Sequence, residues 1–217
     1  PEELEEQLIA RVIHETQAMY PNITENSDYA GVFDERHFAR LQGYIDDAVA
    51  KGAKLTIVGA DKTRAAENNR RMPLHILQNV TEDMQVMHEE IFGPILPVMT
   101  YTDITEVPDK IEPRRNPLAL YYFGKDNAEQ EYLLNHVPSG GACINDITLH
   151  YVQEDLPFGG VGASGMGAYH GPEGFKNMSH GRAIYSQTMI DILPIVGARP
   201  PFGKKFRKNI SKILGAI

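Results

Sequence analysis

The pattern of apolar and polar positions predicts two helices near the start of the chain. The first covers residues 1–20, where four glutamates among the first six residues follow a proline, an arrangement that favours a helix N-terminus. The second covers residues 34–51, and Gly52 follows it as a stop signal. In both segments most apolar residues are three or four positions apart and so form one buried stripe. The stripes are Leu4, Leu8, Ile9, Val12 and Met19 in the first segment, and Phe38, Leu41, Ile45, Ala48 and Val49 in the second.

Short apolar runs bounded by turn residues predict strands further along the chain. Strands are expected within residues 53–58, 95–101, 118–123 and 141–145, with another candidate in the segment LHILQNV. Helical or turn segments separate most of these runs, and such alternation favours parallel pairing through βαβ units. The sequence therefore predicts an α/β fold with three layers: an open, twisted, mostly parallel sheet of at least four strands, with helices on both faces.

Composition and charge narrow the class of protein. Hydrophobic residues make up 42% of the chain and charged residues 23%, as in ordinary globular domains. The apolar runs are far shorter than the ~20 residues that span a bilayer, and no apolar stretch follows a basic N-terminus. We therefore expect a cytoplasmic protein with no transmembrane segment. Residues 1–198 hold 15 basic and 29 acidic side chains, and this excess of acid disfavours nucleic acid as a partner.

Residues 199–217 form a second region, a basic tail with six lysines and arginines and no acid. We expect it to be helical, because its apolar residues share one helical face and its cations lie mostly around the rest. Such a helix can dock on the acidic body or on a partner subunit, which we favour, or contact an anionic membrane surface. The apolar face consists of Phe206, Ile210, Ile213, Leu214 and Ile217, and the cations around it are Lys204, Lys205, Arg207, Lys208 and Lys212.

Two motifs suggest chemistry that their surroundings do not support. Gly160, Gly162 and Gly165 spell the G-x-G-x-x-G of dinucleotide-binding folds, but no apolar strand precedes them and no acid follows about 20 residues later. A loop that passes close to other backbone or to a ligand is the better interpretation. The segments HETQA and HEEIF begin like the zinc motif H-E-x-x-H and lack its second histidine, so we expect no metal site.

The single cysteine, Cys143, excludes a disulfide framework and zinc sites with several cysteines. It lies in the apolar segment GACIND, where a cysteine usually behaves as a small hydrophobic residue. A cysteine hydrolase is an alternative. It would combine Cys143 with His150 or His170 and with Asp146 or Asp155. No local spacing brings these side chains together, so a core position for the thiol is favoured.

Two other segments are better candidates for a binding site. In HEEIFGPILPV, Glu90 and Phe92 precede a Gly-Pro turn that constrains the chain direction and can aim both side chains into a cleft. A carboxylate can accept hydrogen bonds from a diol such as ribose, and an aromatic ring can pack on a flat heterocycle. A helix end with solvated acids explains this pattern equally well. The second segment, residues 157–174, is rich in glycine and is typical of a ligand-facing loop or of a tightly packed structural loop.

These segments resemble the signature blocks of the aldehyde dehydrogenase superfamily. EEIFGPILPV and LPFGGVGASGMGAYHG carry the resemblance, and GVFDERHFARLQGYI and GGACIND are similar to its class 3 branch. Within that branch, YHGPEGF and RPPFGK resemble the bacterial coniferyl aldehyde dehydrogenases. The resemblance implies that residues 1–198 are the C-terminal, catalytic-domain portion of such an enzyme. By analogy it also implies a homodimer.

The resemblance implies oxidation of an aldehyde to a carboxylic acid with NAD or NADP, through attack by a cysteine thiolate and a thioester. By resemblance, Glu90 matches the acid that binds the nicotinamide ribose hydroxyls, and Phe92 matches the aromatic residue beside the nicotinamide. Phe158 matches a residue that lines the substrate tunnel. Tyr169 and His170 are expected on the substrate side.

The sequence departs from the family pattern in the groups that perform covalent chemistry. The family's nucleophilic cysteine lies upstream of a segment like PEELEEQL; its oxyanion-binding asparagine, general base and dinucleotide-binding domain are also missing from these 217 residues. Cys143 lies where the family needs no thiol. We therefore expect no catalytic residue within these 217 residues and no activity from them alone. A non-enzymatic association domain derived from the same family is the second hypothesis, and the Cys143 hydrolase is the third.

Overall fold

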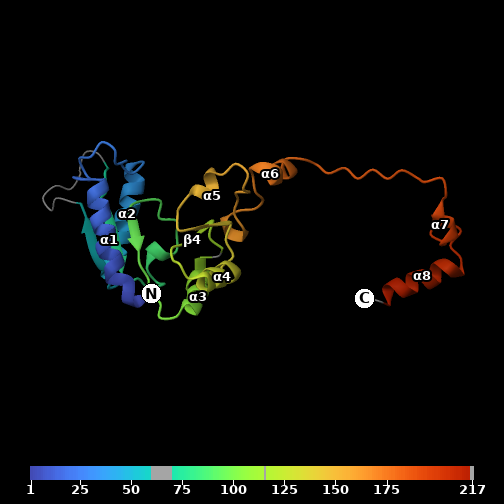
Figure 1. The fold of residues 1–217 in the computed structure, drawn as a ribbon, viewed down its shortest axis with the longest axis horizontal. Coiled ribbons are helices and arrows are strands. Elements are labelled where there is room, and N and C mark those ends of the chain that lie inside the picture. Colours follow the sequence, from blue (N-terminus) through green and yellow to red (C-terminus); the bar gives the residue numbers. More distant parts are fainter. Residues whose placement is uncertain (60–69, 115, 216–217) are drawn as a thin grey trace.

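The computed structural model describes residues 1–59, 70–114 and 116–215. In Figure 1 the chain forms a sheet flanked by helices, then a smaller second sheet, and then two C-terminal helices that lie apart from both. The first sheet has the strand order β1-β2-β3. β1 and β2 are antiparallel, whereas β2 and β3 are parallel. The three strands are β1 (Lys54–Val58), β2 (Leu74–Gln78) and β3 (Ile95–Pro97).

Helices α1 and α2 cover opposite faces of this first sheet. Successive side chains of β2 point to opposite faces, so Ile76 packs with Ile9 of α1 while Leu77 packs with Leu41 of α2. This arrangement confirms the expected three layers. The helices begin and end within a few residues of the expected limits: η1 (Glu2–Leu4) leads into α1 (Glu5–Met19), and α2 spans Glu35–Ala50.

The second sheet is a βαβ unit, as the alternating pattern predicts. β4 and β5 pair in parallel, and α4 connects them. The core of this part contains Leu120, Tyr122, Leu133 and Val137. Short helical turns between the two sheets pack against the same core. The elements of this part are η3 (Ile104–Glu106), α3 (Val107–Ile111), η4 (Glu112–Arg114), β4 (Ala119–Tyr122), α4 (Asn127–His136) and β5 (Gly141–Ile144). One further short turn, η2 (Gln85–Met87), lies between β2 and β3 and packs with α2 in the core of the first sheet.

The strands lie where the sequence predicts them, but their pairing differs from a single sheet of four parallel strands. In the described residues they form a mixed three-stranded sheet and a separate parallel pair. Two local causes are visible. β2 runs antiparallel to β1, so this pair is not a βαβ unit, and β3 has only three residues, with Pro94 directly before it and Pro97 at its end, neither of which has an N–H donor. A groove of about 1140 Å³ lies between α1, residues 98–101 and β4.

The glycine-rich segment packs tightly against its own backbone. A Cβ atom added at Gly159 would lie 2.0 Å from the carbonyl oxygen of Gly167, and one at Gly160 would lie 2.1 Å from that of Ser164. Close approach to other backbone therefore explains these glycines, and no strand-to-helix phosphate loop forms there. The short helices of this region are α5 (Leu149–Val152), η5 (Gly162–Ser164) and α6 (Gly171–Asn177).

The basic tail contains the helix that the sequence predicts. α8 (Lys204–Leu214) follows the short helix α7 (Ile192–Ile195), and an extended segment separates both from the body (Figure 1). Among the described residues, no helix combines the length and apolar character that crossing a membrane requires.

Candidate functional site

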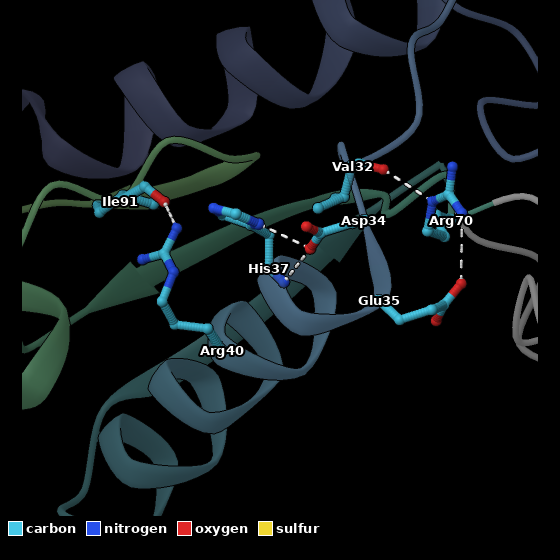
Figure 2. Close-up of polar contacts among 7 residues, drawn as sticks. All are labelled: Val32, Asp34, Glu35, His37, Arg40, Arg70 and Ile91. Atoms are coloured by element: carbon cyan, nitrogen blue, oxygen red, sulfur yellow. Dashed lines mark hydrogen bonds and ion pairs between the residues drawn. The ribbon is translucent and has the colours of Figure 1, made fainter.

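The first part of the candidate site is the N-terminal end of α2. Asp34 caps this helix, and its carboxylate accepts hydrogen bonds at 2.7 Å from the backbone N–H of His37 and at 2.7 Å from the ring Nδ1 of the same residue. Figure 2 shows both contacts. The backbone hydrogen bond and then the ring contact hold the pKa of Asp34 below its usual value. The cap fixes where α2 begins and which way its next turns face.

Arg40, one turn further along α2, holds the backbone of the turn that carries Glu90. Its Nη1 donates to the carbonyl oxygen of Glu90 at 3.1 Å, and its Nη2 donates to that of Ile91 at 2.8 Å. The second contact is drawn in Figure 2. The guanidinium also lies 5.1 Å from the ring centroid of Tyr44, within the range of a cation–π contact. One planar cation thus joins α2 to residues 90–91.

The two neighbouring acids of this turn have different environments. The Glu89 carboxylate accepts a hydrogen bond from the hydroxyl of Tyr44 at 2.6 Å, so it ties the turn to α2. The Glu90 side chain is exposed, and its carboxylate has no hydrogen-bond or ion-pair partner within residues 1–59, 70–114 and 116–215. Of the two, Glu90 is the acid that remains available to a ligand.

Phe92 stands on the rim of a pocket in a strained backbone conformation. Its φ angle is +47°, in the left-handed region, and its side chain is 75% exposed. Gly93 follows it, and a Cβ atom there would lie 2.4 Å from Cδ1 of Leu41 in α2. Close packing at Gly93 therefore fixes the turn, while the ring of Phe92 stays outside the core. The pocket of about 570 Å³ is lined by Ala30, Gly31, Val32, Phe33, His37, Met72, Phe92, Gly93 and Pro94.

This turn fits one end of a nicotinamide cofactor. An unpartnered carboxylate at Glu90 can accept hydrogen bonds from two ribose hydroxyls, and the exposed ring at Phe92 offers a face to a flat heterocycle. Residues that would bind the pyrophosphate on a strand–glycine–helix turn are not found in the described part of the chain, since Gly160, Gly162 and Gly165 lie in a packed loop.

The second part of the candidate site is an aromatic cluster in the glycine-rich segment. Phe158 and Tyr169 form an antiparallel bridge, with both N–H···O distances at 2.9 Å, and their rings meet edge to face at 5.7 Å between centroids. The rings of His170 and Tyr169 meet edge to face at 4.2 Å between centroids, and the ring of Tyr151 in α5 lies 4.9 Å from that of Phe158. The three residues predicted on the substrate side therefore lie together. Burial raises the pKa of Tyr169.

His150 belongs to this cluster, although the sequence suggested it only as a partner for Cys143. Its ring lies between Tyr121, at 5.9 Å, and Phe158, at 5.7 Å, and its edge packs against Gly141 of β5. Both ring nitrogens are buried without a hydrogen-bond partner in the described residues, as is Nδ1 of His170. No signal in the sequence distinguishes His150 from the other histidines, because its neighbours come from β4, β5 and the loop.

The structure does not form the pair that a Cys143 hydrolase needs. Cys143 is a half-buried residue of β5 and lies opposite Tyr121 in the register. Among the described residues neither nitrogen of His150 has a hydrogen-bond partner, nor has Nδ1 of His170. No hydrogen bond joins Cys143 to either histidine in this part of the chain, so no nucleophile–base pair is formed. No group of three or more metal-ligating side chains gathers in the described residues either.

The two parts of the candidate site do not share a pocket in the described structure. The pocket beside Phe92 includes no residue of the glycine-rich segment.

Comparison with known proteins identifies the class of enzyme domain to which this α/β fold belongs. The sequence profile of the aldehyde dehydrogenase family matches residues 1–184, and the chain belongs to this family. Aldehyde dehydrogenases of family 3 are also among the similar proteins, which confirms the resemblance seen in the motifs.

The similar proteins are longer than this chain. The chain is 45% identical over 193 residues to a probable coniferyl aldehyde dehydrogenase of Caulobacter vibrioides, covering 88% of this chain and 40% of that protein. It is 42% identical over 208 residues to a probable coniferyl aldehyde dehydrogenase of Pseudomonas aeruginosa, and the match covers 96% of this chain and 42% of that protein. The solved structure of Staphylococcus aureus AldH in a substrate-bound state matches with a TM-score of 0.77 and 32% identity, covering 98% of this chain and 44% of that one. The chain thus spans less than half the length of these relatives.

Proposed function

We propose that this chain is the C-terminal, catalytic-domain part of an NAD(P)-dependent aldehyde dehydrogenase that oxidises an aldehyde to the carboxylic acid. The body, residues 1–198, carries this function, and residues 199–217 are a separate basic tail. The observation that carries the proposal is the turn at residues 89–93. There Arg40 holds the backbone and Tyr44 holds Glu89, while the Glu90 carboxylate has no partner among the described residues and the Phe92 ring is exposed.

In this proposal Glu90 and Phe92 bind the nicotinamide end of the cofactor. Glu90 accepts hydrogen bonds from the ribose hydroxyls, and Phe92 packs beside the ring. The bound cofactor supplies a hydride acceptor. The role of the two residues is to hold that acceptor in position, so they contribute orientation rather than covalent chemistry. Their fixed backbone means that little conformational entropy is lost when the cofactor binds.

The aromatic cluster is the substrate side of the proposed site. Phe158, Tyr169 and His170 offer ring faces and edges that suit an aromatic aldehyde of the coniferyl aldehyde type, the substrate named for the two bacterial relatives. In the complete enzyme, Phe158→Ala should raise KM for an aromatic aldehyde about tenfold more than for a short aliphatic one, because only the aromatic substrate loses a stacked ring. An equal rise for both aldehydes would remove Phe158 from the substrate site.

The covalent step, in this proposal, uses a cysteine outside these 217 residues. Cys143 is half-buried in β5 and His150 offers it no hydrogen bond in the described structure, so the thiol has no activating base. The 217-residue chain alone should therefore not reduce NAD or NADP in the presence of an aldehyde. We also propose a cytoplasmic homodimer. A non-enzymatic association domain is the second candidate, and the exposed cofactor-type turn at Glu90 and Phe92 favours the enzyme over it.

The decisive experiment compares the oxidation step of two variants of the complete enzyme, Glu90→Gln and Glu89→Gln. Charge-assisted hydrogen bonds contribute roughly 1.5–3 kcal/mol, so Glu90→Gln should slow the oxidation step about ten- to a hundredfold in single-turnover kinetics. Glu89→Gln is the matched control. It replaces the charged acceptor of the Tyr44 hydrogen bond by a neutral amide oxygen, so it should lower stability slightly while leaving the oxidation step within about threefold of the parent. An unchanged oxidation step in Glu90→Gln would exclude the proposed role of this residue.

A further inference from the structure

Helix α8 exposes an apolar stripe along one side. Positions 206, 210, 213 and 214 are three or four residues apart, so they share one face of the helix. Ile213 and Leu214 are 62% and 66% exposed. Phe202 precedes the helix, is 51% exposed, and packs its ring on that of Phe206 at 4.4 Å. The stripe is therefore formed but faces solvent.

The rest of the α8 surface is basic. Five cations occupy the other sides of the helix, and α8 contains no acid. The nearest acid before the helix, Asp191, pairs with Arg199 at 2.6 Å. None of the helix cations has an ion-pair partner in the described part of the chain. These cations are Lys204, Lys205, Arg207, Lys208 and Lys212.

The contacts of α8 are local. The ammonium of Lys205 donates to the carbonyl oxygen of Ile195 at the end of α7, and Asn209 Nδ2 donates to that of Val196 at 3.0 Å. α7 adds exposed apolar residues of its own, since Ile192 and Ile195 are 57% and 58% exposed. The two helices thus form one small unit at the end of the chain, away from both sheets (Figure 1).

Two surfaces could receive this unit, and only one complements all of it. The sequence favours docking on the acidic body or on a partner subunit. In the structure, however, the unit lies apart from the body (Figure 1). A surface that offers acidic side chains alone complements the cations and leaves the apolar stripe in water. An anionic bilayer takes the stripe into its acyl boundary and places the cations among its headgroups.

We propose that residues 192–214 bind the surface of an anionic lipid bilayer, with α8 lying in the plane of the membrane. The helix has 11 residues, which span about 16 Å and cannot cross a hydrocarbon core of about 30 Å. One short helix with five cations binds reversibly, and its binding weakens as salt rises. This inference is independent of the proposed oxidation chemistry, since it concerns where the protein is held.

Vesicle flotation with the 217-residue chain tests the proposal. At low ionic strength the chain should float with vesicles of phosphatidylcholine and phosphatidylserine in equal parts, and should stay at the bottom with phosphatidylcholine alone. Lys204→Gln/Lys208→Gln should lower the partition coefficient about fivefold for each charge removed. Ile213→Asp should abolish flotation, because it places a carboxylate in the apolar stripe.

Two matched variants control for charge and apolar exposure in general. Lys125→Gln/Lys176→Gln removes two exposed cations of the body, and Met166→Asp replaces a 97% exposed apolar residue outside the tail. Both should float like the parent chain. Circular dichroism should show unchanged helix content in the lysine-to-glutamine variant. The proposal is overturned by the absence of flotation at low salt, by equal binding to vesicles without phosphatidylserine, or by binding that the tail variants leave unchanged.

Discussion

The guanidinium of Arg40 donates a 2.8 Å hydrogen bond to the backbone carbonyl oxygen of Ile91, and so links helix α2 to the turn that carries Phe92. The same cation reaches the carbonyl oxygen of Glu90. Because both acceptors are backbone atoms, the link sets the path of the chain and leaves the side chains of Glu90 and Phe92 outside the contact. α2 and this turn therefore act as one rigid element.

Replacing Arg40 should loosen this element. We expect Arg40→Ala to lower the free energy of unfolding by about 1 kcal/mol, since the hydrogen bonds from a charged donor are partly exposed. The stability of Arg40→Lys should lie between that of the parent and that of Arg40→Ala, because an ammonium cannot reproduce the planar fork of donors of a guanidinium. Urea denaturation measures the difference. Arg36→Ala, an exposed position on the same helix, should stay within about 0.5 kcal/mol of the parent, and a loss equal to that of Arg40→Ala would contradict the expectation.

The contact between Gly93 and Leu41 should appear as an energetic coupling. A Cβ atom at Gly93 would lie 2.4 Å from Cδ1 of Leu41, so Gly93→Ala should destabilise the fold by about 1–3 kcal/mol. Leu41→Ala should lower stability by about 2–5 kcal/mol, because Leu41 is fully buried. In the double variant the new methyl group enters the space that Leu41 leaves. The combined loss should therefore be smaller than the sum, and simple additivity in a double-mutant cycle would refute the contact.

The aromatic cluster should depend on the backbone contact at Gly159. Gly159→Ala would bring a Cβ atom to 2.0 Å from the carbonyl oxygen of Gly167, and backbone cannot move aside as a side chain can. We expect the Phe158–Tyr169 bridge to open and the near-ultraviolet circular dichroism signal of the tyrosines to change. Gly181→Ala is the matched control, because a Cβ atom there has no neighbour within 4 Å. Identical spectra for the two variants would show that the loop is not packed in this way.

Stability should depend on pH through His75 of β2. This side chain is 6% exposed, and burial lowers its pKa, although the contact of its Nδ1 with the Pro73 carbonyl oxygen opposes the shift. In the unfolded chain the pKa of His75 is about 6.5, so the unfolded chain binds the proton more readily than the folded chain does. The stability that His75 contributes is present above about pH 6.5 and is lost as the pH falls through the folded-state pKa.

The measurement is the free energy of unfolding of the parent chain and of His75→Gln across this range. The variant should lose less stability than the parent as the pH falls below about 6.5. His14→Gln, at an exposed position of α1, should follow the parent curve. A parallel decline in parent and His75→Gln would show that protonation of His75 does not drive the loss.

The sequence by itself determined the local elements and the family. Spacing of apolar residues located α1, α2, β4 and β5, because the faces of helices and strands repeat at fixed periods, and Asp34 and Gly52 set the ends of α2. Motifs such as EEIFGP identified the family because they resemble its signature blocks, which can be read without the structure. The role of Gly93, however, depends on Leu41, which lies 52 positions earlier.

Only the tertiary structure decided which strands pair with one another and which residues lie together in the candidate site. An apolar run predicts a buried strand and carries no information about its partner or direction, so the antiparallel β1–β2 pair and the division into two sheets could not be predicted. The same reason applies to His150. Its ring lies between Tyr121 and Phe158 because β4, β5 and the glycine-rich loop meet there, and long-range packing of this kind leaves no periodic signal in the sequence.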